Sequence, residues 1–183
     1  MFDLISYDNT GRPRLSVTVE NLNPTLAAFF PANAIYPSSN YATKDIRNVY
    51  PVLDFDDSTN ESIYFVGLMP KQYQGNGIDV NLFFTMTSAT SGDVDWKVSF
   101  ERLAASDQDI DSALIYSSAT TITDVAVPSV SGEIAVSTIT VTSGSRMDNI
   151  VAGDMFSLKL TRDAATDTAT GDAELLGVEL RGS

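Results

Sequence analysis

Residues 93–103 read DVDWKVSFERL, and this stretch decides the fold. From Val94 to Phe100 every second residue is apolar, and the residues between them are charged or carry a hydroxyl group. A period of two is that of a β-strand, because successive side chains of a strand point to opposite faces of a sheet. The alternation therefore predicts a strand that buries Trp96 and Phe100 and turns its polar side outward.

The same alternation recurs in the rest of the chain. It predicts further strands at 49–55, 62–69, 77–86, 120–127, 133–141, 155–162 and 175–180. Phe84 and Leu158 take apolar positions in two of these strands and are predicted core residues. After Ile134 the apolar phase changes toward Ile139, which predicts a β-bulge. About eight antiparallel strands without a long helix between them predict an all-β, jelly-roll-like β-sandwich.

The first 47 residues differ from the others in charge and in proline content. They carry as many acidic as basic residues, whereas residues 48–183 carry the whole net charge of −13. Five of the seven prolines lie before residue 52. Proline lacks the backbone N–H that a sheet needs and favours extended segments. The pattern predicts an extended N-terminal arm over residues 1–47 and a sandwich domain over 48–183, with the apolar stretch 26–30 buried against the domain or a partner.

Composition excludes several classes of function. The 183 residues include 24 acidic and 11 basic side chains, but neither histidine nor cysteine. A polyanion repels nucleic-acid phosphates and anionic membranes, so we expect neither as a partner. Without histidine and cysteine the chain can form no Ser–His or Cys–His nucleophilic pair, no zinc site built on these residues and no disulfide. Apolar runs are too short for a membrane span, and residues 1–20 show no signal-peptide pattern.

Three acidic clusters offer carboxylate oxygens of the kind that calcium binds. They are Asp54, Asp56, Asp57 and Glu61; Asp107, Asp109 and Asp111; and Asp163, Asp167 and Asp172. None has the glycine and the terminal glutamate of an EF-hand loop. Aspartates in turns also cap the backbone amides of their own loop, and this alternative stays open for each cluster. We therefore assign no metal and no cofactor.

Carboxylates can hydrolyse glycosidic bonds and aromatic rings can stack on sugars, so the positions of both kinds of residue in the predicted strands bear on carbohydrate chemistry. A glycosidase needs two carboxylates about 5–9.5 Å apart, but Asp95 and Glu101 are about 20 Å apart along the predicted strand. We therefore predict that the protein is not an enzyme. Trp96 could stack on a sugar ring, but its alternation places it in the core. Five tyrosines are better candidates for an exposed aromatic surface: Tyr36, Tyr41, Tyr50, Tyr64 and Tyr73.

A pattern of strands and turns extends over residues 50–181. Its features are the DFD sequence at 54–56 before the strand 62–70, Tyr73 and Gly75 in a turn, the segments 87–92 and 93–96, and then 152–154, 158–163, Asp167 and 171–179. This pattern resembles the β-sandwich domains of bacteriophage capsid cement and decoration proteins and of related head- or tail-fibre proteins. The resemblance implies a jelly roll, usually trimeric, that lies on the outer capsid lattice and bridges capsomers. Fibre proteins use the same sandwich, so the fold alone does not fix the location.

On this resemblance the chain is predicted to be a non-catalytic capsid cement or decoration protein of the virion, made in the host cytoplasm without a signal peptide. Its expected partners are the major capsid protein and further copies of itself in a homotrimer, with no small-molecule substrate. The predicted docking residues are Arg12, Arg14, Leu26, Phe29, Phe30 and Arg47. For the arginines, loose surface charge is the other interpretation. The alternative function is a glycan-recognising tail-fibre or carbohydrate-binding module.

Overall fold

The computed structural model describes the backbone of residues 6–7, 13–14, 24–105 and 108–183, and the side chains of the last two ranges. The predicted docking residue Arg12 and the side chain of Arg14 therefore lie outside the described residues. Strands β1 (Ser6–Tyr7) and β2 (Pro13–Arg14) pair with each other. Among the described residues, no helix has the length and apolar character needed to cross a membrane.

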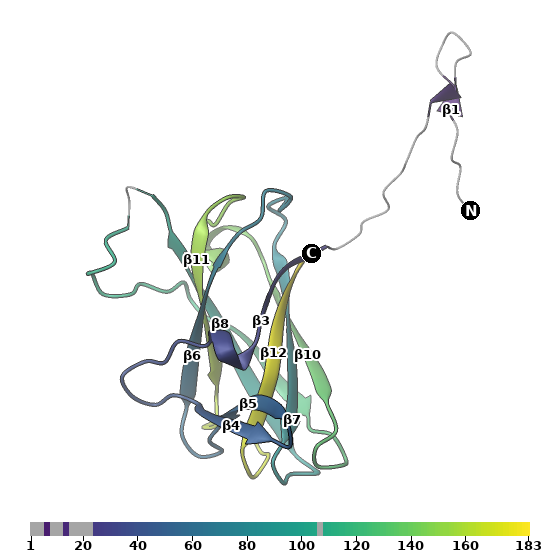
Figure 1. Ribbon diagram of the computed structural model, residues 1–183, viewed down its shortest axis with the longest axis vertical. Helices are drawn as coiled ribbons and strands as arrows, with labels where there is room; N and C mark the ends of the chain where they lie inside the picture. Colours follow the sequence, from purple (N-terminus) through teal and green to yellow (C-terminus); the bar gives the residue numbers. More distant parts are fainter. Residues whose placement is uncertain (1–5, 8–12, 15–23, 106–107) are drawn as a thin grey trace.

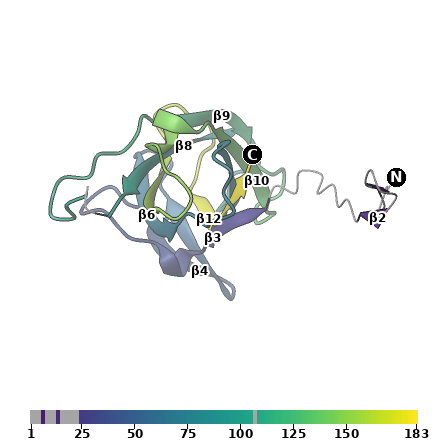
Figure 2. The same cartoon turned by 90° about the horizontal axis from the view of Figure 1, so that it is seen from above.

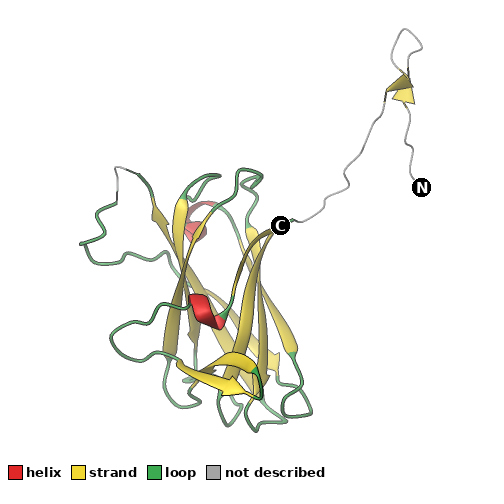
Figure 3. Ribbon diagram, viewed as in Figure 1, coloured by secondary structure: helices red, strands yellow, loops and turns green. Residues whose placement is uncertain are grey.

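Apart from the β1–β2 pair, ten strands form two antiparallel sheets, so the predicted all-β sandwich is confirmed (Figures 1 and 3). The four-stranded sheet has the order β6 (Glu61–Leu68), β11 (Met155–Arg162), β8 (Asp93–Leu103), β9 (Thr120–Ala126). The six-stranded sheet has the order β10 (Ala135–Val141), β7 (Ile78–Met86), β12 (Ala173–Gly182), β5 (Tyr50–Phe55), β4 (Thr43–Arg47), and β3 (Thr25–Phe29) also pairs with β12. Two 3-10 helices, η1 (Pro31–Asn33) and η2 (Gly144–Met147), lie in loops.

The apolar faces of the two sheets meet in one core, which the strands surround when seen from above in Figure 2. Trp96 of β8 contacts Phe55 and Phe84 of the other sheet edge to face, with ring centroids 5.2 and 5.7 Å apart. Trp96, Phe84, Phe100 and Leu158 have no exposed surface. Because its ring is enclosed in this way, Trp96 offers no surface on which a sugar could stack.

The segment between residues 24 and 47 belongs to the sandwich, which differs from the predicted arm. Thr25–Phe29 pairs antiparallel with β12, and Thr43–Arg47 pairs antiparallel with β5. Phe29 is 6% exposed and its ring stacks on that of Phe65 at 5.1 Å. The prolines of the segment interrupt it between short strands, while the apolar residues gain more by completing a sheet over the core than by staying extended in water. The described sandwich therefore starts before the predicted boundary at residue 48.

The bulge predicted within residues 133–141 is wrong. Strand β10 pairs with β7 in continuous register from Ala135 to Val141. The apolar phase changes because Ile134 and Val136 point outward, where they are 56% and 55% exposed, while Ile139 points into the core. Exposed aliphatic side chains on a sheet face mark a surface that can bury them against a ligand or partner.

Candidate functional site

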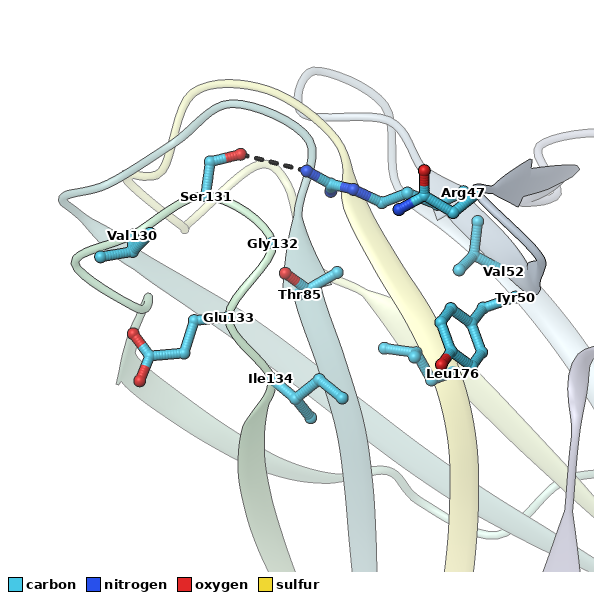
Figure 4. Close-up of a pocket in the computed structure, with 11 residues that line it drawn as sticks. Arg47, Tyr50, Val52, Thr85, Val130, Ser131, Gly132, Glu133, Ile134 and Leu176 are labelled. Atoms are coloured by element: carbon cyan, nitrogen blue, oxygen red, sulfur yellow. Dashed lines mark hydrogen bonds between the residues drawn. The ribbon is translucent and has the colours of Figure 1, made fainter.

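A cavity of about 730 Å³ lies on the outer face of the six-stranded sheet (Figure 4). The turn that joins β4 to β5 forms one side, the loop before β10 forms the other, and β7 and β12 run beneath. We call it the Tyr50 cavity, defined by Arg47, Tyr50, Thr85, Gly132, Ile134 and Leu176. Its size is that of ligand sites in general, which measure roughly 300–1,000 Å³.

Strand pairing brings distant parts of the sequence together at this cavity. Glu174 of β12 lies opposite Thr85 of β7 on one side and opposite Asp54 of β5 on the other. A register shift in β12 directly after Leu175 accompanies the outward position of Leu176, which lines the cavity. A bulge of this kind redirects a side chain that regular alternation would place elsewhere.

The rim of the Tyr50 cavity carries exposed apolar side chains. Tyr50 is 62% exposed, Val130 60% and Ile134 56%. Figure 4 shows Tyr50 and Ile134 on opposite sides of the cavity, with Leu176 close to the tyrosine ring. An aromatic ring beside a concave apolar surface offers a flat area for the C–H face of a ligand, and its hydroxyl can still form hydrogen bonds.

Arg47 is fixed in place at the upper end of the cavity as drawn in Figure 4. Its Nη1 donates to the Met86 carbonyl at 2.8 Å and forms an ion pair with Glu174, and its Nη2 donates to the Ser131 hydroxyl at 3.2 Å. Gly132 adopts a φ of +88°, and a Cβ there would lie 3.2 Å from Nη2 of Arg47. A guanidinium carries five N–H donors. Two of them, the Nε–H and one Nη2–H, have no partner among the described residues and can serve a ligand.

Thr85 provides a second polar group that lacks a partner. The residue is 3% exposed, and its Oγ1 has no hydrogen-bond partner among the described residues. Burial of an unsatisfied hydroxyl costs roughly 1–3 kcal/mol. Because Thr85 lines the cavity, a ligand hydroxyl can remove this cost by pairing with it.

Two carboxylates lie on adjacent strands beside the cavity. Glu174 is 4% exposed and is neutralised by Arg47. Asp54, across the strand pair, has a buried Oδ1 without a partner among the described residues. Burial, and after it the negative charge of Glu174, raises the pKa of Asp54 to about 6. Asp54 is therefore mostly ionised at neutral pH, but its ionisation lowers the stability of the folded protein.

We expect the substitution Asp54→Asn to stabilise the protein at pH 7 by about 1–2 kcal/mol. A carboxyl with a raised pKa binds its proton more tightly in the folded state, so stability is lost as the pH rises from the ordinary pKa of 3.8 to the folded pKa of about 6, and this loss is nearly absent at pH 4. The stabilisation should accordingly vanish at pH 4. Urea denaturation at both pH values measures the effect, with the exposed Asp111→Asn as control. An Asp54→Asn variant that is less stable than the parent at pH 7 would contradict the assignment.

The four predicted docking residues that the structure describes with their side chains lie in different environments. Phe29 lies in the core, Leu26 is half-buried, and Phe30 is 59% exposed. Arg47 is held in the Tyr50 cavity by its ion pair with Glu174. No local pattern in the sequence indicates this pair, because its partners are 127 positions apart.

The five predicted surface tyrosines separate into different environments. Tyr50 lines the cavity described above, and Tyr73 is 6% exposed in the core. Tyr36 and Tyr41 contact each other edge to face at 5.6 Å. Tyr64 stacks on Tyr116 on the outer face of the other sheet.

The acidic clusters are rearranged by the fold. Carboxylate oxygens of Asp56, Asp57 and Asp172 lie within 4.8 Å of one another, so parts of two predicted clusters meet. Asp163 pairs with Lys97 and Asp167 with Arg162. Two of these three carboxylates already accept hydrogen bonds from the protein. Asp56 accepts N–H groups of its own turn, and Asp57 accepts the backbone N–H of Gly171. The bonds of Asp56 match the alternative in which a turn aspartate caps the amides of its own loop, whereas Asp57 caps a loop far away in the sequence.

In the predicted cluster of Asp107, Asp109 and Asp111, Asp107 lies outside the described residues. Asp109 accepts the backbone N–H of Asp111 at 3.0 Å, which is the same use of a turn aspartate.

Asp95 and Glu101 serve the structure of their loops. Asp95 accepts the backbone N–H of Asp124 and the hydroxyl of Thr166, and Glu101 accepts the backbone N–H of Ile115. Both are nearly fully buried, at 4% and 1% exposed, and Glu101 lines a separate pocket of about 190 Å³ that Asp95 does not line.

Comparison with known proteins finds similarity at the level of the fold. No protein-family model matches the sequence, and no curated protein sequence is significantly similar to it. A family 35 carbohydrate-binding module from an environmental isolate is 13% identical, with a TM-score of 0.45 over 82% of this chain and 93% of that one.

Two further similar structures come from named organisms. A carbohydrate-binding module of Cellvibrio mixtus lichenase 5A, in complex with cellotriose, is 10% identical, with a TM-score of 0.41 over 87% of this chain and 99% of that one. The family 11 module of Clostridium thermocellum, in complex with a β-1,3-1,4-mixed-linked tetrasaccharide, is 8% identical, with a TM-score of 0.42 over 92% and 94%.

These comparisons correct the predicted function. The similar structures are carbohydrate-binding modules, not phage capsid proteins, and the prediction of a capsid cement or decoration protein is wrong. The order and spacing of strands and turns on which this prediction rested occur in β-sandwiches of many functions. What the residues and the structure have in common with the phage proteins is the sandwich itself.

Proposed function

We propose that the protein is a non-catalytic glycan-binding module, and that the Tyr50 cavity holds a sugar residue of a neutral polysaccharide. The observation that carries the proposal is the pairing of an exposed aromatic ring, Tyr50, with a buried hydroxyl that lacks a partner, that of Thr85, in one concave site. A sugar ring presents an apolar C–H face and several hydroxyls. It therefore matches a surface that offers both a ring and fixed polar groups.

Each part of such a ligand has a counterpart in the cavity. The C–H face packs against Tyr50, Leu176 and Ile134, and the hydroxyls meet Thr85 and the two free N–H groups of Arg47. Arg47 is already held by Glu174 and by two oxygen acceptors, so it loses little conformational freedom when a ligand binds.

The absence of a catalytic pair supports binding without turnover. Glu133 is the one carboxylate among the described residues that line the cavity. Glycoside hydrolysis needs two carboxyl groups on either side of the bond that is cleaved. Glu174, which lies nearby, is neutralised by Arg47 and buried.

We expect Tyr50→Ala to weaken glycan binding about 10- to 100-fold, because truncation of a central aromatic contact typically costs 1–3 kcal/mol or more. Isothermal titration calorimetry with cello-oligosaccharides and mixed-linked β-glucan oligosaccharides is the first measurement, followed by affinity electrophoresis against xylan, mannan and galactan. Trp96 is a poor reporter because it is fully buried. Tyr41→Ala, a tyrosine 40% exposed outside the cavity, is the matched control.

Thr85→Val tests the polar half of the site. The variant keeps the shape of the side chain and removes the unsatisfied hydroxyl, so we expect unchanged or higher stability together with weaker binding. Failure of the parent to bind any of these glycans, or equal affinity of the parent and both cavity variants, would refute the proposal.

A further inference from the structure

A second groove lies on the opposite face of the sandwich, over the four-stranded sheet. It has a volume of about 520 Å³, and we call it the lysine groove, defined by Asn60, Ser62, Tyr64, Lys97, Lys159 and Thr161. Strand register arranges its floor in two rows across β6, β11 and β8. Tyr64 lies opposite Lys159, which lies opposite Ser99, and Ser62 lies opposite Thr161, which lies opposite Lys97.

Positive charge gathers here although the chain is strongly acidic. The sequence has four lysines, and two of them, Lys97 and Lys159, line this groove. No carboxylate is among the described residues that line it. The two lysines lie on a diagonal of neighbouring strands, which separates their Cβ atoms by about 7–8 Å.

The two lysines differ in their partners. Lys97 forms an ion pair with Asp163, which is 5% exposed and also accepts the amide of Asn60. Lys159 has no ion-pair partner among the described residues and is half-buried. A partly desolvated ammonium attracts an anion more strongly than a fully hydrated one, since the local dielectric is lower.

Neutral donors and an aromatic ring surround Lys159. The hydroxyls of Ser62 and Thr161 are 2.8 Å apart, and Ser99 is 8% exposed beside them. The Tyr64 ring is stacked on that of Tyr116, with centroids 5.6 Å apart and planes at 9°. The Tyr116 hydroxyl is in turn held by Ser157 at 2.7 Å. The pair therefore holds the Tyr64 ring in place on the strand opposite Lys159.

We propose that the lysine groove is a second binding site, for a polysaccharide that carries carboxylate groups, with one uronate on Lys159 and a neighbouring ring beside Tyr64. A single free ammonium with hydroxyl neighbours matches one carboxylate per site. Sulfate esters, with three acceptor oxygens, are better matched by arginine forks, and the groove has no arginine among its described lining residues. The net charge of −13 opposes the binding of any polyanion. Charges more than about 8 Å away are largely screened at physiological ionic strength, so the groups next to Lys159 decide this contact.

The test measures binding of oligogalacturonates by titration calorimetry, with their methyl esters and a sulfated glycan as comparisons. We expect Lys159→Met to weaken oligogalacturonate binding about 10- to 100-fold, the range of a charge-assisted hydrogen bond. The exposed Lys71→Met, which lies outside the groove, and Tyr50→Ala should leave this affinity unchanged within about twofold. Methyl esterification should abolish binding.

Three results would overturn the proposal. They are an absence of oligogalacturonate binding by the parent, equal affinity of the parent and the Lys159→Met variant, and preference for the sulfated glycan over the uronate. An unchanged urea midpoint for Lys159→Met shows that the variant is folded. Tyr50→Ala changes only the Tyr50 cavity on the six-stranded sheet, whereas Lys159→Met changes only the lysine groove on the four-stranded sheet. A failure of neutral glycan binding is therefore distinguishable from a failure of uronate binding.

Discussion

Substitution of Arg162 by methionine is expected to destabilise the protein by about 3–5 kcal/mol at pH 7. Arg162 is completely buried, and its Nε donates to the carboxylate of Asp167 at 2.7 Å. Its other N–H groups donate to the carbonyls of Phe55, Gly171 and Ala169 at 2.9–3.1 Å. Methionine fills much of the space but leaves a buried charge and three carbonyls without donors. A loss of this size is a large part of a typical stability of 5–15 kcal/mol.

Urea denaturation followed by fluorescence of the single tryptophan measures the Arg162 effect, because Trp96 is buried in the core. Lys159→Met is the control on the same strand, and we expect a change within about 0.5 kcal/mol. Burial raises the pKa of Asp167, which Arg162 opposes. The loss should therefore shrink as the pH is lowered, because Asp167 without its partner takes up a proton more readily. A loss below 1 kcal/mol at pH 7 with an unchanged m-value would contradict this role of Arg162.

Substitution of Arg47 by methionine is the second large effect, with an expected loss of about 2–3 kcal/mol at pH 7. The loss is smaller than for Arg162 because the Arg47 side chain is 32% exposed, whereas that of its partner Glu174 is 5% exposed. Without Arg47, the buried charges of Glu174 and Asp54 repel each other across the strand pair. Glycan binding at the Tyr50 cavity should be lost as well.

A double-mutant cycle separates the ion pair from packing at this site. Glu174→Gln in the Arg47→Met background should recover more than half of the lost stability, since it removes the uncompensated charge. Arg146→Met serves as the control, because that guanidinium donates to two exposed backbone carbonyls and to no carboxylate that is described. If Glu174→Gln worsened the Arg47→Met variant, the pair would not be the cause of the loss.

Local patterns in the sequence predict the positions of most strands in the two sheets. The alternation at residues 93–103 led to a strand at Asp93–Leu103 with Trp96 inside, and the other alternating stretches also became strands. Such patterns work because the period of two is a property of each strand by itself. They misled at Ile134, where an apolar residue lies outside, because alternation cannot tell a core face from a face that lines a cavity.

The candidate sites were only partly visible beforehand. The sequence predicts Tyr50 and Tyr64 as surface aromatic residues but does not indicate which residues lie beside them. Thr85, Leu176 and Lys159 have no local signal, since a single threonine, leucine or lysine in a strand is ordinary. The ion pair of Arg47 with Glu174 also has no local signal, because the two residues are 127 positions apart in the chain.

The sequence by itself determined that the chain is an acidic all-β protein, that it lacks histidine and cysteine chemistry, and which side of most strands is apolar. These are properties of composition and of neighbouring residues. Only the tertiary structure decided which strands lie side by side, and thereby placed Tyr50 with Thr85 and Arg47 on one sheet and Lys159 with Tyr64 on the other. The physical reason is that a binding site depends on distances in space, and in a sandwich these are set by strand register and sheet order across long stretches of chain.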